Sequence, residues 1–324
     1  MIVGSCEFGG AGTQNAGLVF NGRGPVNHPN ATGFTQEYSG GVWSFTNNTI
    51  DAGRYCNEGL GTQNAALSVG GYVCKCTEEY NGSTWAAGGA LSQNRYGHIA
   101  VGSVNAALAA GSSTSAEEYN GTSWAAAASM ADNGSNFEGG GTQNAAIATM
   151  GNSPFGTCTR HYNGINWSYE GALATSRCKG GVTGTQNSAV AFGGCINPAD
   201  TALTEQYDGT AWSNSGTLNT ARKALAYAGS GTQALAAGGS PAIVTCTEEY
   251  YGGTFHGTLS AWSAGGALIT GRNYLDGTGI QNAALAVGGI TPSVVACTEE
   301  YNGENWAVGG ALSIGRADNN AVFG

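Results

Sequence analysis

One sequence motif of about forty-four residues recurs along the whole sequence, and this periodicity limits the possible folds more than any other feature. The clearest copy runs from Gly61 to Arg95. A Tyr followed by a Trp marks every copy, and the pairs use all seven Trp residues: Tyr38/Trp43, Tyr80/Trp85, Tyr119/Trp124, Tyr162/Trp167, Tyr207/Trp212, Tyr250/Trp262 and Tyr301/Trp306. A fixed period of this length is typical of propellers and solenoids.

Each copy contains four short candidates for β-strands, separated by turn residues. In the clearest copy these are residues 54–61, 65–69, 77–80 and a strand that begins at Trp85. Asn81-Gly82 separates the last two and is a strong signal for a two-residue hairpin. Four-stranded sheets repeated around an axis form a β-propeller. We therefore expect an all-β fold in which residues 1–324 form a single domain of seven blades, each with four antiparallel strands.

Two other repeat architectures fit the pattern less well. A helical repeat would place few Gly inside its elements, because each costs about 1 kcal/mol relative to Ala, whereas this chain has 56 Gly at matching places in its copies. An open β-solenoid usually has shorter coils and lacks the Tyr-Asn-Gly-x-x-Trp hairpin.

The motif resembles the kelch repeat, which combines a Gly doublet, a Tyr on the next strand and a Trp about six residues later. The doublets are Gly70-Gly71, Gly193-Gly194, Gly238-Gly239 and Gly288-Gly289, with weaker forms at Asn21-Gly22, Ala110-Gly111 and Met150-Gly151. An Arg opens most units: Arg54, Arg95, Arg177, Arg222, Arg272 and Arg316. The resemblance implies a kelch-type propeller. The motif Gly-Thr-Gln-Asn-Ala-Ala also resembles motifs of kelch-like structural proteins of tailed phages, notably marine ones. This resemblance implies a role in a virion.

Composition and charge exclude several classes of function. Charged residues make up 10% of the chain, the formal net charge is −10, and only three residues are Lys. Binding of nucleic acid through a basic surface is therefore not expected, because phosphate neutralisation dominates such binding. We expect no membrane span, since no window approaches eighteen apolar residues, and no signal peptide at Met1–Ser5. The many Asn, Thr, Ser and Gly suit a virion protein or, alternatively, an extracellular or cell-surface protein.

Residues that could carry chemistry are scattered. The four His, namely His28, His98, His161 and His256, fall at different positions of different copies. We therefore expect no catalytic residues, no metal site and no cofactor. Of nine Cys, Cys74 and Cys76 are too close in sequence for a zinc knuckle, and we expect the cysteines to be buried reduced thiols.

The Glu that precedes the Tyr recurs as Glu37, Glu79, Glu118, Glu249 and Glu300. These carboxylates could ring a channel for cations, or each could pair with the Arg that opens its blade. We favour the pairs Arg54–Glu79, Arg95–Glu118, Arg222–Glu249 and Arg272–Glu300, because a buried charge needs a partner. The fourth copy has Ser135 in place of the Arg and His161 in place of the Glu.

The ring is expected to close through contacts between the C-terminal segment and the first blade. The first copy lacks its own Arg, so we expect the segment from Arg316 to Gly324 to meet the first blade, with Arg316 near Glu37 and a short strand after it. Alternatively, Met1–Phe8 alone supplies the inner strand.

The seven Trp residues are expected to lie buried between neighbouring blades. They are Trp43, Trp85, Trp124, Trp167, Trp212, Trp262 and Trp306.

The loops expected at one end of the blades vary in length and sequence, whereas the turns expected at the other end do not. The Gly-Thr-Gln-Asn turns and the Asn-Gly hairpins fall at one end and barely vary, while the loops between second and third strands fall at the other. Variable loops on a rigid scaffold commonly form binding sites, although the variation in these loops could also have no function. The expected partner-binding residues are His28, Asn30, Tyr72, Phe155, Asn197 and Asp200.

We therefore expect a non-enzymatic binding or structural module, such as a phage tail, fibre or capsid-decoration protein. Its partners would be other virion or surface proteins. The alternatives are a carbohydrate-binding protein that recognises host glycans, for which Tyr72 and Phe155 are hints, and an enzyme of the kelch type.

Overall fold

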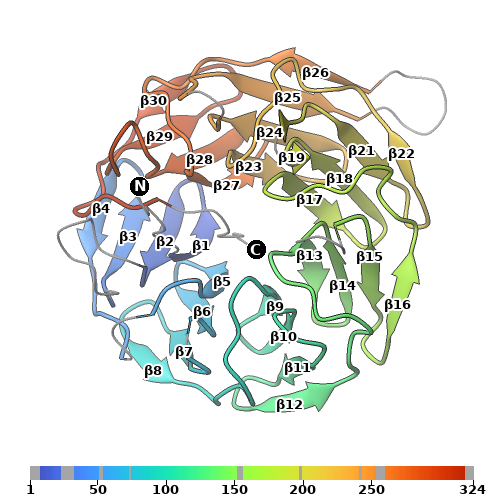
Figure 1. Cartoon of the computed structure of the whole chain (residues 1–324). Coiled ribbons are helices and arrows are strands. Elements are labelled where there is room, and N and C mark those ends of the chain that lie inside the picture. Colours follow the sequence, from blue (N-terminus) through green and yellow to red (C-terminus); the bar gives the residue numbers. More distant parts are fainter. Residues whose placement is uncertain are drawn as a thin grey trace.

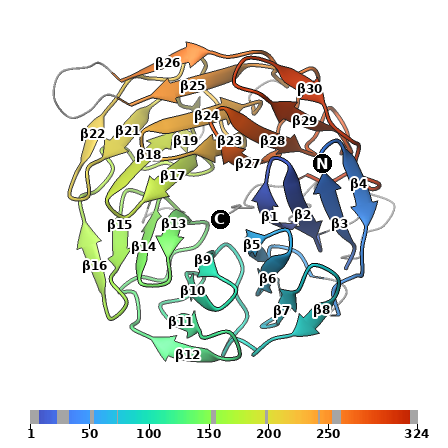
Figure 2. The ribbon, with the colours of Figure 1, turned by 180° about the vertical axis from the view of Figure 1, so that it is seen from behind.

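A computed structural model of the chain describes residues 8–22, 33–50, 54–72, 74–151, 156–196, 199–240, 243–252 and 260–317. Seven four-stranded antiparallel sheets stand around a central axis (Figures 1 and 2). The residues in these ranges form strands, bridges and turns but no helix, and accordingly none of them forms a helix that could cross a membrane. The all-β, seven-bladed fold expected from the repeat is confirmed.

Each blade is built from one continuous stretch of chain, with its first strand innermost. Blades one to four comprise β1 (Gly9–Thr13), β2 (Ala16–Phe20), β3 (Thr35–Ser39), β4 (Val42–Phe45); β5 (Glu58–Thr62), β6 (Ala65–Val69), β7 (Thr77–Tyr80), β8 (Trp85–Ala87); β9 (Ile99–Ser103), β10 (Ala106–Ala110), β11 (Ala116–Tyr119), β12 (Trp124–Ala127); and β13 (Glu138–Thr142), β14 (Ala145–Thr149), β15 (Thr159–Tyr162), β16 (Trp167–Glu170).

Blades five to seven comprise β17 (Gly181–Thr185), β18 (Ser188–Phe192), β21 (Thr204–Tyr207), β22 (Trp212–Asn214); β23 (Ala226–Gly229), β24 (Gln233–Ala237), β25 (Thr247–Tyr251), β26 (Ala261–Ala264); and β27 (Asp276–Ile280), β28 (Ala283–Val287), β29 (Thr298–Tyr301), β30 (Trp306–Val308). A two-stranded hairpin, β19 (Cys195–Ile196) with β20 (Ala199–Asp200), rises from the loop of blade five.

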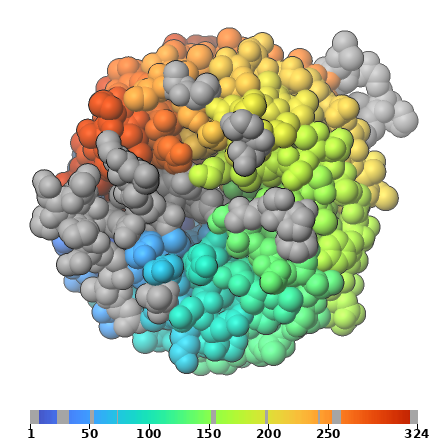
Figure 3. All heavy atoms as spheres, in the orientation of Figure 1, coloured from blue at the N-terminus to red at the C-terminus, as the bar shows by residue number. Residues whose placement is uncertain are grey.

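The antiparallel strand order gives the ring two different ends. The turns between first and second strands and the hairpins between third and fourth strands lie at one end, here called the turn face. The loops between second and third strands and the connections between blades lie at the other end, here called the loop face. The chain colours run once around the ring in the space-filling view (Figure 3).

Glycine at the end of each inner strand is required by the backbone. The seven residues at this position, Gly12, Gly61, Gly102, Gly141, Gly184, Gly229 and Gly279, have φ between +103° and +126°. A Cβ there would collide with the carbonyl oxygen four residues later, and L-residues rarely adopt such φ values. This explains why the glycine persists in the turns of blades three and six, which otherwise depart from the Gly-Thr-Gln-Asn motif and read Gly102-Ser103-Val104-Asn105 and Gly229-Ser230-Gly231-Thr232.

The same reasoning explains the uneven doublets. The second doublet position, exemplified by Gly71 and Gly151, is a glycine with φ between +98° and +131° in six blades. In blade three the strand register instead places Gly111 (φ +102°) at the first position and Ser112 (φ +64°) at the second. At the first position, Asn21 and Met150 have φ of 57°, a left-handed value that non-glycine residues can adopt at a cost. Six blades therefore require glycine at the second position, and blade three requires it at the first.

Neighbouring blades are joined through each Trp. Trp43, Trp85, Trp262 and Trp306 are buried, and Trp124, Trp167 and Trp212 are partly buried. In six blades the indole Nε1–H donates to a Thr that begins the third strand of the preceding blade, as in Trp124 to Thr77 at 2.8 Å. The exception is Trp167, because Ala116 occupies the Thr position of blade three. Within the described chain Trp167 Nε1 has no partner.

The buried Arg residues pair with acids one position earlier than the sequence analysis expected. The ion pairs are Arg54–Glu78 (2.9 Å), Arg95–Glu117 (2.9 Å), Arg177–Glu205 (3.2 Å), Arg222–Glu248 and Arg272–Glu299. Adjacent residues on a strand point to opposite faces of its sheet, so the two Glu of each Glu-Glu pair have different roles. The expected pairs with Glu79, Glu118, Glu249 and Glu300 are wrong.

The second Glu of each pair instead receives a hydrogen bond from the next blade. Tyr162 Oη donates to Glu118 at 2.6 Å and Tyr301 Oη to Glu249 at 2.6 Å. Tyr119 donates to Glu79 in the same way. The Glu-Tyr dipeptide of the repeat thus supplies an acceptor to one neighbouring blade and a donor to the other.

Blade one meets blade seven through the contacts that join the other blades. Trp43 Nε1 donates to Thr298 Oγ1 at 2.9 Å, and Gln14 Nε2 donates to the carbonyl of Tyr301 at 2.6 Å. β27 and β28 therefore lie beside β1 and β2, as Figure 1 shows. All four strands of blade one come from residues 9–45. The strand expected after Arg316 falls on residues 318–324, and most of Met1–Phe8 likewise lies outside the described residues.

Arg316 reaches the first blade but does not pair with Glu37. Its Nη2 donates to the carbonyl of Phe34 at 3.0 Å and its Nη1 to that of Asn21. Glu37 accepts from Tyr80 Oη at 2.7 Å. Gln36 occupies the position that carries the paired Glu in five other blades, and its Oε1 accepts from the amide of Ser313 at 2.9 Å.

Candidate functional site on the loop face

A pair of residues faces each other at the loop face of several blades. One follows the repeat Arg and the other follows the second glycine of the doublet. The backbone bridges Cys178↔Cys195, Lys223↔Ser240 and Asn273↔Ile290 are of this kind, and the amide of Tyr72 donates to the carbonyl of Tyr55 at 2.8 Å. We call this position the facing pair. The backbone geometry recurs, whereas the side chains differ completely.

In blade two the facing pair is aromatic. The rings of Tyr55 and Tyr72 stack with centroids 5.1 Å apart, and Tyr96 meets Tyr72 edge-on at 5.7 Å. Tyr72 is 42% exposed and Tyr96 is 48% exposed. The three rings form one partly exposed aromatic cluster that joins the connections of blades two and three.

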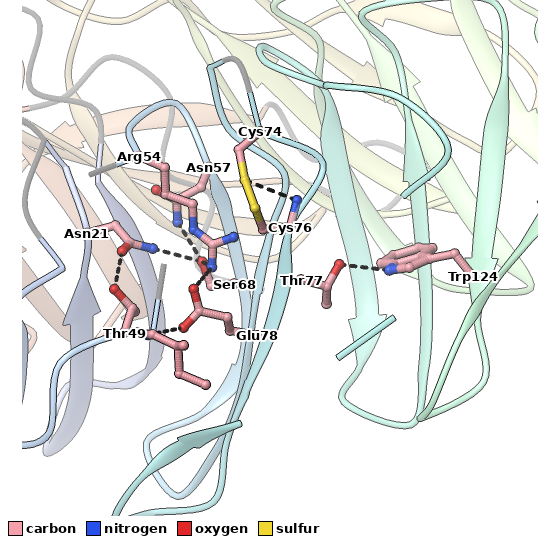
Figure 4. Close-up of a disulfide and its surroundings, with 11 residues drawn as sticks. Asn21, Thr49, Arg54, Asn57, Ser68, Cys74, Cys76, Thr77, Glu78 and Trp124 are labelled. Carbon is pink, nitrogen blue, oxygen red and sulfur yellow. Dashed lines mark hydrogen bonds and ion pairs between the residues drawn. A yellow bond between two sulfur atoms is a disulfide. The ribbon is translucent and has the colours of Figure 1, made fainter. Parts of the chain in front are cut away.

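Arg54, which precedes Tyr55 in the chain, belongs to a buried polar network between blades one and two (Figure 4). Ser68 Oγ lies 2.8 Å from Arg54 Nη2 and 3.0 Å from the side-chain amides of Asn21 and Asn57. Glu78 accepts from the amide of Ile50 at 2.7 Å. Buried polar groups that are hydrogen-bonded in this way hold a single geometry. The network therefore fixes the Arg54 connection that carries Tyr55.

A disulfide joins Cys74 to Cys76 in the loop of blade two (Figure 4). This corrects the expectation that the cysteines are all reduced and buried. Among the other described cysteines, Cys246 is exposed, and Cys56, Cys158, Cys178, Cys195 and Cys297 are partly buried. From the sequence, Cys74 and Cys76 were weighed only as zinc ligands, and a disulfide between them was not expected.

In blade five the facing pair consists of two thiols. Cys178 Sγ and Cys195 Sγ are 3.0 Å apart. Burial, followed by the neighbouring Cys195, raises the pKa of the Cys178 thiol to about 11. At the end of the same hairpin, Asp200 forms an ion pair of 2.6 Å with Lys223, which raises the pKa of that ammonium group.

The structure describes two of the six expected partner-binding residues. Tyr72 belongs to the aromatic cluster of blade two, and Asp200 to the ion pair of blade five. Neither contacts the other in the described structure. His28, Asn30, Phe155 and Asn197 lie outside the described residues.

The axial channel contains a polar contact that the sequence analysis missed. Tyr227 Oη, from blade six, donates to Glu138 Oε2, from blade four, at 2.7 Å. The ring of Tyr227 passes over Gly181 of blade five, where a Cβ would lie 3.1 Å from it. Burial raises the pKa of Glu138 to about 8, although the hydrogen bond from Tyr227 works in the opposite direction.

A cavity of about 200 Å³ lies in this channel, lined by inner-strand residues such as Gly140, Thr183 and Thr278. Glu58, Glu138 and Asp276 share the first position of their inner strands, and all three act electrostatically on Tyr227. Aligning the copies at this residue would have revealed the acids. In the described ranges no three His, Cys, Asp or Glu side chains are grouped so as to hold a metal ion.

Comparisons with known proteins give a fold and no family. No family model matches the sequence, and no curated protein matches it. Among solved structures the chain is similar to one titled "Structure of YjhT", with a TM-score of 0.60 and 13% sequence identity. The match covers 79% of this chain and 97% of that one. At this identity the likeness concerns the fold alone.

Proposed function

We propose that this chain is a non-enzymatic, kelch-type propeller that acts as a binding or structural module in a phage virion, as a tail, fibre or capsid-decoration protein. The observation that carries the proposal is the contrast between the two ends of the blades. Turn residues recur from blade to blade, whereas the facing pair changes from two aromatic rings to two thiols to Lys223 with Ser240. Variable side chains on a fixed backbone are typical of binding surfaces.

The kelch assignment rests on the repeat itself. The glycine doublet, the opening Arg and the Tyr and Trp of each hairpin have defined structural roles in the ring. The virion assignment rests on the similarity of the Gly-Thr-Gln-Asn-Ala-Ala phrase to structural proteins of tailed phages and on the low content of charged residues.

The test is to find what the protein is attached to. Mass spectrometry of purified particles, followed by electron microscopy with a labelled antibody, should detect it at a defined place on the virion. Loop-face variants Tyr72→Ala and Asp200→Ala should weaken attachment, whereas the turn-face variant Asn144→Ala should not. Absence from particles, or attachment lost only in Asn144→Ala, would contradict the proposal.

Carbohydrate binding is a second candidate, and the aromatic cluster of Tyr55, Tyr72 and Tyr96 favours it. Exposed rings can stack against the apolar face of a sugar while their hydroxyl groups bond to its polar edge. A glycan array should then give hits that are lost in Tyr72→Ala and kept in Tyr251→Ala, which removes an exposed aromatic residue from the turn face. Equal hits for both variants would exclude this cluster as the site.

A further inference from the structure

Two thiols face each other in blade five with the geometry of a disulfide precursor. Cys178 and Cys195 exchange two backbone hydrogen bonds of 3.2 and 2.8 Å, and residues paired in this way have Cα atoms about 5.5 Å apart. That spacing suits a disulfide. With Sγ atoms at 3.0 Å, the two sulfurs need to approach by only about 1 Å to bond.

The repeat does not require cysteine at this position. The facing pair is Tyr55 with Tyr72 in blade two, Lys223 with Ser240 in blade six and Asn273 with Ile290 in blade seven. A simple packing role for small apolar residues does not account for two thiols here, because blades two, six and seven use large or polar side chains. Both thiols are only partly buried, so a small reagent can reach them.

Cationic groups surround this pair in a chain that has only three Lys. The ammonium groups of Lys179 and Lys223 both act to lower the pKa of Cys178, although burial outweighs them. Lys223 also interacts electrostatically with Cys195 and holds Asp200. Burial holds the proton on Cys178, which makes Cys178 the poorer nucleophile of the pair. The first attack is therefore assigned to Cys195, which lies near the Lys223 ammonium group, because a nearby cation stabilises an attacking thiolate.

We propose that Cys178 and Cys195 form a redox-active dithiol that closes to a disulfide by exchange with a low-molecular-weight disulfide, with Cys195 as the attacking thiolate. Cys195 Sγ attacks one sulfur of the small disulfide, which forms a mixed disulfide and expels one thiolate. Cys178 then loses its proton and displaces the second small thiol. The protein loses two protons and two electrons, and the small disulfide is reduced to two thiols.

Closure would attach the hairpin β19–β20 covalently to the connection that begins blade five. The hairpin ends at Asp200, whose carboxylate pairs with Lys223 at the start of blade six. The oxidised form would hold this part of the loop face by a covalent bond and an ion pair, and the reduced form by hydrogen bonds and the ion pair. The binding properties of the loop face would therefore depend on its redox surroundings.

The test titrates the full chain with mixtures of reduced and oxidised glutathione, followed by acid quenching, alkylation with N-ethylmaleimide and peptide mapping. Cys178 and Cys195 should lose their alkyl groups together and appear as one cross-linked pair of peptides that is lighter by about 2 Da. The melting temperature should rise by about 5 °C on closure, because the bridge restricts the unfolded chain. Exposed Cys246 should form only a mixed disulfide with glutathione.

Single variants assign the two sulfurs. In Cys178→Ser a stable glutathione adduct should accumulate on Cys195, while Cys195→Ser should react several-fold more slowly at Cys178. Lys223→Gln should slow closure several-fold, and Lys75→Gln, beside the other cysteine bridge, should not. Full alkylation of both thiols after Cys246 is completely glutathionylated would overturn the dithiol. Equal rates in the two Ser variants would overturn the role of Cys195.

Discussion

Blades three and four bury an ion pair at the same place but in opposite directions. In blade three, Arg95 lies in the connection and Glu117 on the strand β11. In blade four, Asp132 lies in the connection and Arg160 on the strand β15, with a distance of 2.6 Å. Both pairs are almost completely buried. The fold therefore accommodates a buried ion pair at this place in either direction and does not fix which element carries which charge.

The residues around the ion pair also differ between blades three and four. Arg160 stacks on Phe137, with its guanidinium carbon 4.3 Å from the ring centroid, and Tyr169 Oη donates to Asp132 at 2.6 Å. The residue equivalent to Phe137 in blade three is His98, which is buried beside Arg95. An aromatic ring suits a cation on the strand, because its face attracts the positive charge.

The largest expected effect comes from removing one partner of either pair. Arg95→Met and Arg160→Met should each lower the free energy of unfolding by about 3–5 kcal/mol, since each leaves a buried carboxylate without its partner. Chemical denaturation measures both. The double variant Arg95→Met/Glu117→Leu should recover much of the loss. A cost below about 1 kcal/mol for Arg160→Met alone would show that the reversed pair is not equivalent.

The next comparison concerns the Trp residues of the same two blades. Trp124→Ala should cost about 3–5 kcal/mol, as for other large core truncations. Trp167→Ala should cost about 1 kcal/mol less, because Trp167 Nε1 has no hydrogen bond to lose in the described structure. Denaturation midpoints of the two variants provide the measurement. Equal losses would mean that the indole hydrogen bond contributes nothing.

The third comparison uses pH. Burial, and then Arg95, lower the pKa of His98 to about 3. The unfolded state binds a proton below the ordinary His pKa of about 6.5, and the folded state does not, so stability falls as the pH drops from about 6.5 towards 3. His98→Phe, which copies blade four, should remove this dependence, worth about 2 kcal/mol at pH 5. Parallel stability curves for the variant and the natural chain would refute the assignment.

The repeat was enough to predict the seven blades, their strand order and the two ends of the ring. Period, turn residues and glycine positions are local properties, and the glycine that ends the inner strand is present in all seven copies. The ion pairs were assigned one residue too late because Glu78 and Glu79 look alike in sequence, and only the strand alternation separates the Arg side from the Tyr side. The channel contact between Tyr227 and Glu138 was missed because it spans two blades that are not neighbours.

The loop face was harder to predict, since its side chains do not repeat. Sequence variety selected Tyr72 and Asp200, but the actual contacts depend on which residues the backbone bridges place opposite each other. Counting from the second glycine of each doublet to the residue after the preceding Arg would have paired Tyr55 with Tyr72 and Cys178 with Cys195. These pairs could therefore have been predicted by aligning the doublet of each copy with the Arg that precedes it.

The smallest effect should be a gain in stability. Ala116→Thr places a hydroxyl group where six other blades have one, so Trp167 Nε1 acquires its acceptor and the free energy of unfolding should rise by about 0.5–1.5 kcal/mol. The extra methyl group must fit beside Ala127. The equivalent Thr coexists with a side chain at that place in three blades, as Thr35 does with Thr46 and Thr204 with Ser215. Ala116→Val is the matched control, because it adds similar volume without a hydroxyl group. If Val stabilises as much as Thr, packing and not the indole hydrogen bond accounts for the gain.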